Sequence, residues 1–316
     1  MLKISSLCAA LVMAAFSAPV QAQDFPTRPV TLVIPFGPGG STDPVGRYLA
    51  EALQEKWGQP VVVSNVPGAG STIGTTSVAK AESDGHTLLF TTAAYTTAAA
   101  SFEKLPYDAK EDIIPVAITT TTPYVVVGSS KLEAASPEEL KTLSETRPLF
   151  LATAGLGSSA HFAGELFLRA LGTQFKPIHY KGSAEAMLDM VAGRSDIYVG
   201  SVTAAVENIT SGQVRALAVL GSERSASLPD VPTTAELGLD ASAFQWFGVF
   251  APKGTDPAII QKINADVNEA MAADAGKELA AKFGATVKSM SPEEFSEFVH
   301  KEIDLWSDLA ADMKKP

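Results

Sequence analysis

In Val33-Ile-Pro-Phe-Gly-Pro-Gly-Gly-Ser-Thr-Asp-Pro-Val-Gly-Arg47 an apolar segment meets a helix start through a loop rich in glycine. We predict a strand over Val30–Ile34, which runs into this loop, and a helix that begins at Asp43-Pro44. Glycine has no Cβ, so the backbone can turn sharply here and approach a ligand closely. The first turn of the helix leaves N–H groups unpaired, and the helix dipole adds roughly +0.5 of a charge. The stretch therefore predicts an anion site within a strand–loop–helix unit.

The same loop limits which anion is expected. It lacks the Gly-Lys-Ser/Thr ending of a P-loop, which argues against a nucleoside triphosphate. Pro44 disfavours helical geometry at the residue before it, so Asp43 is expected to cap the helix. In that position its carboxylate shapes the loop and does not touch the ligand.

The first residues have the pattern of an export signal. Lys3 precedes an apolar run from Leu7 to Phe16, and Ala18-Pro-Val-Gln-Ala22 supplies a small-x-small cleavage site. At about ten residues the run is too short to span a bilayer, which needs roughly 20. We therefore expect residues 1–22 to be a signal peptide cleaved after Ala22, with a buried N-terminal helix as the alternative.

The composition is typical of an acidic protein with a packed core. Of 24 basic residues one, Lys3, lies in the leader, so 23 remain against 35 acidic ones and the mature charge is −12. An acidic chain without a basic block is a poor binder of nucleic acid or of a membrane surface. Hydrophobic residues make up 46% of the chain, and the 294 residues after the leader (316 less 22) suffice for two domains. The only cysteine, Cys8, lies in the leader, so we expect no disulfide in the mature chain.

Apolar segments alternate with helical ones, which favours an α/β fold. Several strands are apolar on both faces, as is typical of strands covered by helices on both sides. Asp or Ser precedes proline at four expected helix starts, at residues 43, 136, 256 and 291. After Ser291 an apolar stripe at helical spacing predicts a last helix that packs in the core. The expected strands are Val30–Ile34, Val61–Ser64, Thr87–Thr92, Tyr124–Gly128, Phe150–Ala154, Ile197–Gly200, Ala216–Leu220 and Trp246–Ala251.

A second glycine loop lies in Phe150-Leu-Ala-Thr-Ala-Gly-Leu-Gly-Ser-Ser-Ala-His161. Gly155 and Gly157 supply a tight turn, and the hydroxyl of Ser158 or Ser159 can cap the next helix or donate to an oxyanion. A nucleophile elbow needs Gly-x-Ser-x-Gly, which this loop does not match. His161 follows in the same helical turn, so we expect it to contact the first turn or line a cleft, not to act as a base.

Three further features of the sequence bear on cofactor, metal and ligand binding. Pro67-Gly-Ala-Gly-Ser-Thr-Ile-Gly74 has its third glycine one place too late for a dinucleotide fingerprint, which leaves a helix-start turn or a third loop near a cleft. Metal-ligating clusters are absent from the sequence, so neither metal nor cofactor is expected. Lys181, in Tyr180-Lys-Gly182, is either a cationic ligand contact or a solvated surface lysine.

Together these motifs resemble one known family. Val33–Arg47 is similar to the Pro-Phe-x-x-Gly-Gly-x-x-Asp-x-x-x-Arg signature of Bug-type periplasmic receptors, which serve tripartite tricarboxylate transporters. The likeness covers essentially the whole mature chain, in order. It continues in Asn65-Val-Pro-Gly-Ala-Gly70, Asp84-Gly-His-Thr-Leu-Leu89, Ala154-Gly-Leu-Gly-Ser-Ser-Ala-His161, Tyr180-Lys-Gly182, Gly193-Arg-Ser-Asp196, Gly212-Gln-Val-Arg-Ala-Leu217 and Leu228-Pro-Asp-Val-Pro-Thr233.

The resemblance implies a fold and its boundaries. It implies a two-lobed, type II periplasmic-binding α/β fold whose hinge is two crossing strands, near Tyr124-Val125 and Phe244–Trp246. Residues 24–124 plus 246–316 would form the first lobe, and residues 125–245 the second. It implies a monomer located in the periplasm.

The resemblance also implies a function. The chain would be a solute-binding receptor, not an enzyme, that captures a small organic mono- or dicarboxylate and delivers it to a membrane transporter. An exported sensor or adaptor, or a serine hydrolase using Ser158 or Ser159, are the alternatives, and the carboxylate is left open among citrate-like, aliphatic and aromatic acids. The candidate ligand-binding residues are Phe36, Pro38, Gly39, Gly40, Ser41, Asp43, Thr92, Ala93, Gly155, Gly157, Ser158, Ser159, His161 and Lys181.

Overall fold

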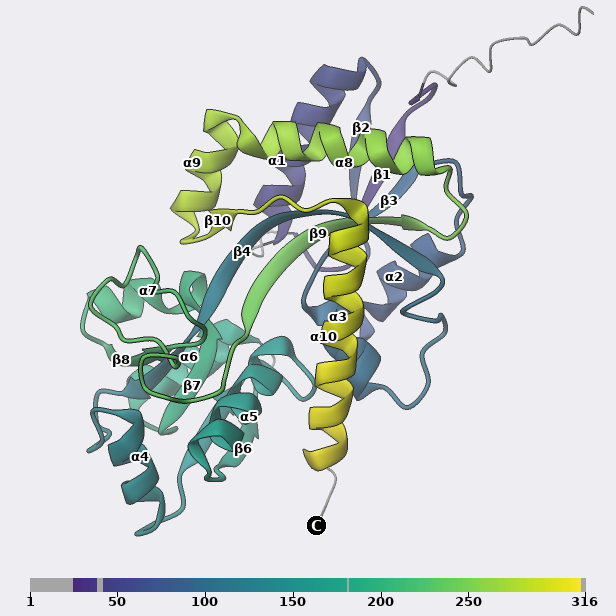
Figure 1. The fold of residues 1–316 in the computed structure, drawn as a ribbon. Coiled ribbons are helices and arrows are strands. Elements are labelled where there is room, and N and C mark those ends of the chain that lie inside the picture. The colour runs from purple at the N-terminus through teal and green to yellow at the C-terminus, as the bar shows by residue number, and fades with distance from the viewer. Residues whose placement is uncertain (1–24, 39–41, 181, 314–316) are drawn as a thin grey trace, which may run out of the picture.

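The computed structural model describes residues 25–38, 42–180 and 182–313. Their strands form one mixed sheet in the order β2-β1-β3-β9-β4-β7-β5-β6, with β8 and β10 also paired to β4 (Figure 1). The strands are β1 (Val30–Ile34), β2 (Val61–Asn65), β3 (Thr87–Thr92), β4 (Ile113–Ser129), β5 (Phe150–Thr153), β6 (Lys176–His179), β7 (Ile197–Ser201), β8 (Val214–Val219), β9 (Phe244–Pro252) and β10 (Thr286–Val287).

Strand β4 joins two halves of the molecule. It has 17 residues, of which the first part pairs with β9 and the last part pairs with β7 and β8. The change of partner falls between Pro123, opposite Phe244, and Tyr124, opposite Ser201. At about 3.3 Å per residue such a strand is long enough to belong to both halves, and Figure 1 shows β4 and β9 curving from one into the other.

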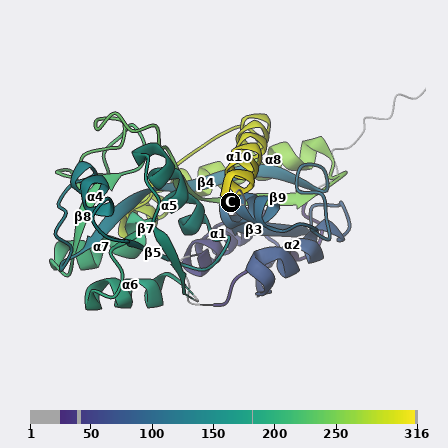
Figure 2. The same ribbon diagram turned by 90° about the horizontal axis from the view of Figure 1, so that it is seen from below.

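Helices cover both faces of each half, as the strands that are apolar on both sides require. In the first half α1 and α8 pack on one face, while α2, α3 and the beginning of α10 pack on the other. In the second half α4, α5 and the end of α10 cover one face, and α6 and α7 cover the other (Figure 2). The helices are α1 (Thr42–Trp57), the short η1 (Ala69–Ser71), α2 (Thr72–Ala79), α3 (Ala94–Ser101), α4 (Pro137–Ser144), α5 (Ser159–Leu171), α6 (Ser183–Ala192), α7 (Val202–Thr210), α8 (Pro257–Ala272), α9 (Asp274–Lys282) and α10 (Pro292–Met313).

Most helix starts follow the sequence signals. Ser136 and Asp256 accept hydrogen bonds from amides in the first turns of α4 and α8, and each stands before a proline. At α10 the Ser291 hydroxyl accepts from the Glu294 amide while the Glu294 carboxylate accepts from the Ser291 amide, which is a capping box. The exception is Asp43, which is the second residue of α1 and not its cap.

Two strands and part of a third were missed by the sequence analysis. The expected strand over Tyr124–Gly128 is the end of the much longer β4, and β6 and β10 were not expected. In β6 a lysine, a proline and a histidine stand among four residues, so it carries no apolar pattern. Its position as an edge strand, paired only with β5, explains why it tolerates Pro177.

The last helix packs in the core, as its apolar stripe predicts, and it contacts both halves. Phe295 and Val299 are buried in the first half, whereas Trp306 and Leu309 are buried in the second. The lobe boundaries inferred from the resemblance stay a prediction, and the packing of α10 adds contacts across them. None of the described helices is long and apolar enough to cross a membrane.

A buried carboxyl group sits where α10 passes between the halves. Glu302 Oε2 accepts hydrogen bonds from Thr96 Oγ1 of α3 at 2.7 Å and from Trp246 Nε1 of β9 at 2.8 Å. Burial raises the pKa of Glu302 from 4.5 to about 7, although both hydrogen bonds lower it. Since the folded state then holds the proton more tightly than the unfolded state, the contribution of Glu302 to stability is fully present below about pH 4.5 and is lost as the pH rises to about 7.

We predict that Glu302→Gln removes this pH dependence, because the amide keeps an acceptor oxygen and cannot ionise. Between pH 4.5 and 7.5 the free energy of unfolding of the wild type should fall, relative to the variant, by on the order of 3 kcal/mol. Urea denaturation at several pH values measures the difference. Glu297→Gln on the exposed face of α10 is the control and should follow the wild type; parallel profiles for Glu302→Gln and the wild type would contradict the prediction.

Candidate functional site

The first glycine loop leaves the sheet at the end of β1. Pro35 is buried, Phe36 is half-buried, and Gly37 and Pro38 are exposed, so the chain passes from the core to the surface over four residues. Helix α1 begins after the loop, at Thr42. The remaining predicted site residues of this loop lie outside the described residues, as does one later in the chain: Gly39, Gly40, Ser41 and Lys181.

A polar network ties this loop to its helix. Asn65 Nδ2, at the end of β2, donates to the Phe36 carbonyl at 3.1 Å and to Asp43 Oδ1 at 3.0 Å. Arg47 Nε donates to Asp43 Oδ2 at 2.9 Å, and another guanidinium nitrogen donates to Asn65 Oδ1 at 3.2 Å. The Asp43 carboxylate is therefore buried and held by two partners, which supports its predicted role in shaping the loop. Arg47 is bonded to the same network.

Thr92 and Ala93 lie at the end of β3, next to the hinge strand β9. The Thr92 hydroxyl accepts from the Ala94 amide at 3.1 Å, and the Ala93 amide donates to the Trp246 carbonyl at 3.3 Å. Both residues are buried, at 4% and 1% exposed. They therefore tie the end of β3 to α3 and β9.

The second glycine loop connects β5 to α5. Gly155 and Gly157 have φ of 125° and 73°, in the left-handed region that favours glycine. Ser158 caps α5, because its hydroxyl accepts from the His161 amide at 3.2 Å. The Gly157 amide in turn donates to His161 Nδ1 at 3.2 Å, so the side chain of this buried histidine lies under the loop and supports it.

This arrangement does not build a Ser–His pair. His161 Nδ1 is taken by the Gly157 amide, and Nε2 faces Glu165 at 3.6 Å. The Ser159 hydroxyl donates to Gln245 Oε1 at 3.2 Å and not to an imidazole. The geometry thus gives no support to a serine hydrolase.

A polar cavity of about 130 Å³ lies beside the second loop. Helices α5, α6 and α7 all begin at its wall, and the two hinge strands β4 and β9 form another side. Gln245 Oε1, in β9, accepts from Tyr124 of β4 at 2.7 Å as well as from Ser159. None of its lining residues carries a charge. They are Thr122, Tyr124, Ala154, Ser158, Ser159, Ala160, Ser183, Tyr198, Ser201, Thr203, Gln245 and Phe247.

Several of these residues were not expected from the sequence. Ser183, Tyr198, Ser201 and Gln245 were not among the candidate ligand-binding residues. Ser201 does carry a readable signal, since a serine after an apolar strand caps α7 by accepting from the Ala204 amide at 3.3 Å. Tyr198 and Gln245 come to the cavity only because β7 and β9 pair with β4, and this long-range pairing has no local sequence signal.

The second loop also touches the first half of the molecule. Ser101 Oγ, at the end of α3, lies 3.5 Å from the Gly157 carbonyl oxygen. A Cβ added at Gly157 would stand 2.7 Å from Ser101 Oγ and 3.0 Å from its Cβ. The two halves therefore meet at this point with no room for a side chain.

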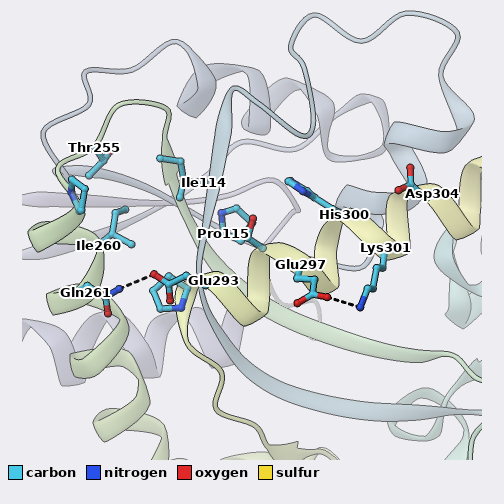
Figure 3. A pocket seen from close by; sticks show the side chains of 13 residues that line it. Ile114, Pro115, Thr255, Ile260, Gln261, Glu293, Glu297, His300, Lys301 and Asp304 are labelled. Atoms are coloured by element: carbon cyan, nitrogen blue, oxygen red, sulfur yellow. Dashed lines mark hydrogen bonds and ion pairs between the residues drawn. The ribbon is translucent and has the colours of Figure 1, made fainter.

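A larger hollow, of about 640 Å³, lies elsewhere. It is a groove between the starts of α8 and α10 and the beginning of β4 (Figure 3). Several of its polar side chains pair at the surface: Gln261 Nε2 donates to Glu293 at 3.1 Å, and Lys301 Nζ donates to Glu297 at 2.6 Å. Glu297 and Lys301 are 68% and 74% exposed, so this is a surface groove and not a site with converging donors. Among the residues that the structure describes, no group of three His, Cys, Asp or Glu side chains is placed to hold a metal ion.

The sequence matches the family model described as tripartite tricarboxylate transporter family receptor, over residues 45–314. It is 41% identical over 302 residues to the protein BugT of Bordetella pertussis, with 94% of this chain and 93% of BugT covered. These matches agree with the resemblance found in the motifs.

The structure is similar to several solved ones. The periplasmic binding protein BugD has a TM-score of 0.77 and 33% identity, with 91% of this chain and 98% of BugD covered. MatC from Rhodopseudomonas palustris with bound malate has a TM-score of 0.78 and 33% identity, with 90% and 100% covered. A further R. palustris protein, with adipate, has a TM-score of 0.80 and 32% identity, with 91% and 98% covered. The predicted α/β fold of the periplasmic-binding type is confirmed by these likenesses.

We predict that Gly157→Ala costs more stability than an alanine at an equally strained but open position. Gly212 has nearly the same φ, 74° against 73°, and nothing within 4 Å of an added Cβ, so Gly212→Ala measures backbone strain alone. That strain is worth about 1–2 kcal/mol. Gly157→Ala should lose this amount and roughly 1 kcal/mol more, because Ser101 must shift. Equal losses in urea denaturation would show that the contact between the halves is loose.

Proposed function

Because this chain belongs to the receptor family of the tripartite tricarboxylate transporters, we propose that it captures a small organic carboxylate between its two halves and delivers it to the membrane subunits of such a transporter. The observation that carries the proposal is the uncharged polar cavity where three helix starts, the second glycine loop and both hinge strands meet. The malate and adipate bound by two similar proteins support carboxylates as the ligand class.

The family membership decides two of the expectations. The assignment to Bug-type receptors is confirmed, and so is the expectation that the chain is a receptor and not an enzyme. One of the similar structures is named a periplasmic binding protein. We place this chain in the same compartment, on the strength of the leader pattern in residues 1–22, which lie outside the described residues.

In this proposal one carboxylate binds between the two glycine loops. The first glycine loop is the anchor in the first half, where the described Phe36 and Gly37 carry backbone N–H groups, and the half-buried start of α5 is the anchor in the second. Within the second loop the Gly157 amide is taken by His161, and the Gly155 amide donates to Thr153 Oγ1 at 3.4 Å. The donors left at this loop are the first-turn amides of α5, at Ser159 and Ala160.

Neutral donors suffice for the affinity a receptor needs. Hydrogen bonds to a charged group contribute roughly 1.5–3 kcal/mol each, so four or five approach the roughly 8 kcal/mol of a micromolar complex before ordering costs. A helix end adds about 0.3–1 kcal/mol. These values require that bulk water be excluded, which closure of the halves about β4 and β9 provides. The net charge of −11 for the whole chain acts against an approaching anion only within the screening length of about 8 Å.

We predict that organic acids stabilise the purified protein whereas their amides do not. Succinate, glutarate and adipate should raise the melting temperature in proportion to the logarithm of concentration, because each binds only the folded state. At about 100 times the dissociation constant the gain is roughly 2.7 kcal/mol. Differential scanning fluorimetry with the matching diamides as controls measures this. Equal shifts for acids and amides would mean that the carboxylate is not what is recognised.

A second prediction concerns the network at the first loop. Asn65→Ala should weaken carboxylate binding by about tenfold, because it frees the Phe36 carbonyl and loosens the loop around Asp43. Asn208→Ala on α7, outside this network, is the control and should bind as the wild type does. Isothermal titration gives both constants. Unchanged affinity in Asn65→Ala would remove the first loop from the site.

A further inference from the structure

A buried histidine holds the second glycine loop through an imidazole nitrogen that carries no proton. His161, in the first turn of α5, is 2% exposed. Its Nδ1 lies 3.2 Å from the amide nitrogen of Gly157, and an amide N–H can only donate. Nδ1 must therefore accept, so the ring of His161 is neutral and its proton is on Nε2.

Acid removes this hydrogen bond by changing the ring itself. A protonated imidazole carries an N–H at both nitrogens and accepts nothing. Two N–H groups would then face each other where Gly157 now donates to His161, so the loop and the ring must separate. An imidazole is the side chain that changes charge between about pH 5 and 8, so mild acid is enough to produce this change.

The position of the loop matters at two places. The loop leads into the start of α5, whose first-turn amides are the donors proposed for the ligand. It also meets the first half of the molecule, because Ser101 Oγ lies 3.5 Å from the Gly157 carbonyl oxygen. A loop released at Gly157 therefore disturbs both the ligand anchor and the contact between the halves.

Two titratable groups face the ring of His161 directly. Glu165, one turn further along α5, has Oε1 at 3.6 Å from Nε2, and its negative charge favours a proton on the imidazole. His179 of β6 lies edge-on to His161, with the ring centroids 4.9 Å apart. Burial lowers the pKa of His179, and the neighbouring His161 lowers it further, whereas Glu165 raises it. His179 therefore stays neutral to a lower pH than an ordinary histidine does.

The other elements packed against α5 present mostly neutral or paired groups. Tyr124 of β4 and Tyr198 of β7 stay neutral because burial raises the pKa of each. Asp312 of α10 is paired with Arg169. Helix α3 and strand β5 bring a serine and a threonine to the loop, and α4 is bonded to the chain just after α5. Glu302 of α10 does change charge in the same range, since burial raises its pKa to about 7, so its effect has to be removed in the test.

We propose that His161 is a positioning residue for ligand capture: its neutral ring holds the second glycine loop in the shape that anchors the carboxylate, and protonation of Nδ1 releases the loop and weakens binding. The proposal rests on the carboxylate-receptor function above and adds a dependence on acidity. The receptor then holds its solute more tightly at neutral pH than in mild acid, through a group that does not touch the solute.

The release of the loop can be measured without a ligand. In the isotope-labelled protein, nuclear magnetic resonance follows the amide resonance of Gly157 and the ring resonances of His161 from about pH 8 to about pH 5.5. The two should change together with one midpoint, because the same proton breaks the hydrogen bond. The amide of Gly212, which has nearly the same φ and lies after α7, is the control and should not follow that midpoint.

The effect on binding is measured with His161→Asn. The asparagine side-chain oxygen can accept from the Gly157 amide and is not protonated in this range. The probe is the tightest binder among adipate, glutarate and succinate. The ratio of the wild-type to the variant dissociation constant should rise about three- to tenfold between about pH 7.5 and about pH 5.5, because one ordinary hydrogen bond is lost in the wild type. Ionisation of the acid itself affects both proteins equally and cancels in the ratio.

Three control variants show which group causes the rise. His179→Asn, on the neighbouring ring, and His300→Asn, on α10 at the distant groove, should both keep the wild-type pH profile. Glu302→Gln, introduced into both the wild type and His161→Asn, should leave the ratio as it was.

The outcomes separate this proposal from the proposed function. A Gly157 resonance that stays constant, or that changes with a midpoint different from that of His161, overturns the release of the loop and requires no variant. A changing resonance with a constant ratio of dissociation constants overturns the effect on binding. Both results leave the carboxylate receptor standing. A wild type that binds none of the three acids at any pH overturns the proposed function, while the Gly157 resonance still decides whether His161 holds the loop.

Discussion

The antiparallel pairing of β4 with β9 is the constraint on which the rest of the structure depends. The two strands pair with each other through the first half. From Tyr124 onward, β4 pairs with β7 and β8 instead. The pairing of β4 with β9 runs from Ile113 to Pro123, with register shifts between Pro115 and Ala117 and between Ile118 and Thr120, and it links the two halves through one sheet. The second glycine loop and three helix starts come to one cavity because β7 pairs with the second part of β4, and β5 and β6 follow β7 in the sheet. Gln245 and Tyr124 thus connect the hinge to the cavity directly.

The electrostatics of the polar cavity are set by dipoles, because the described residues that line it carry no charge. A cation in the site would have to be desolvated each time the halves closed over a ligand, at a cost that can exceed the Coulombic gain. Backbone amides, hydroxyls and helix ends are fixed in direction by the fold. The charges near the first loop, Asp43 and Arg47, neutralise each other within the Asn65 network. Their effect is on the geometry of the loop.

The sequence predicted local features well and long-range ones poorly. Each local feature can be recognised in a short stretch of sequence: the two glycine loops, the helix starts marked by proline and the apolar stripe of α10. The first part of β4, with Thr119 to Thr122 between two prolines, gains its strand character only from pairing with β9 and β10. Tyr198 looked like any apolar strand residue, because its open hydroxyl is visible only once α6 and α7 stand beside it. The expectation that Asp43 caps α1 was wrong. It rested on the conformational preference of a residue before proline, which takes no account of the hydrogen bonds that Asn65 and Arg47 donate to Asp43.

Helix α10 has a mechanical consequence. Its first turns are packed with one half and its last turns with the other, where Trp306 lies edge-on to Phe162 at a centroid distance of 5.7 Å. Any wide opening of the receptor must either bend this helix or withdraw an indole from the α5 core into water, and both cost free energy. Contacts of α10 with both halves thus oppose their wide separation. Helix α10 therefore limits how far the two halves can separate.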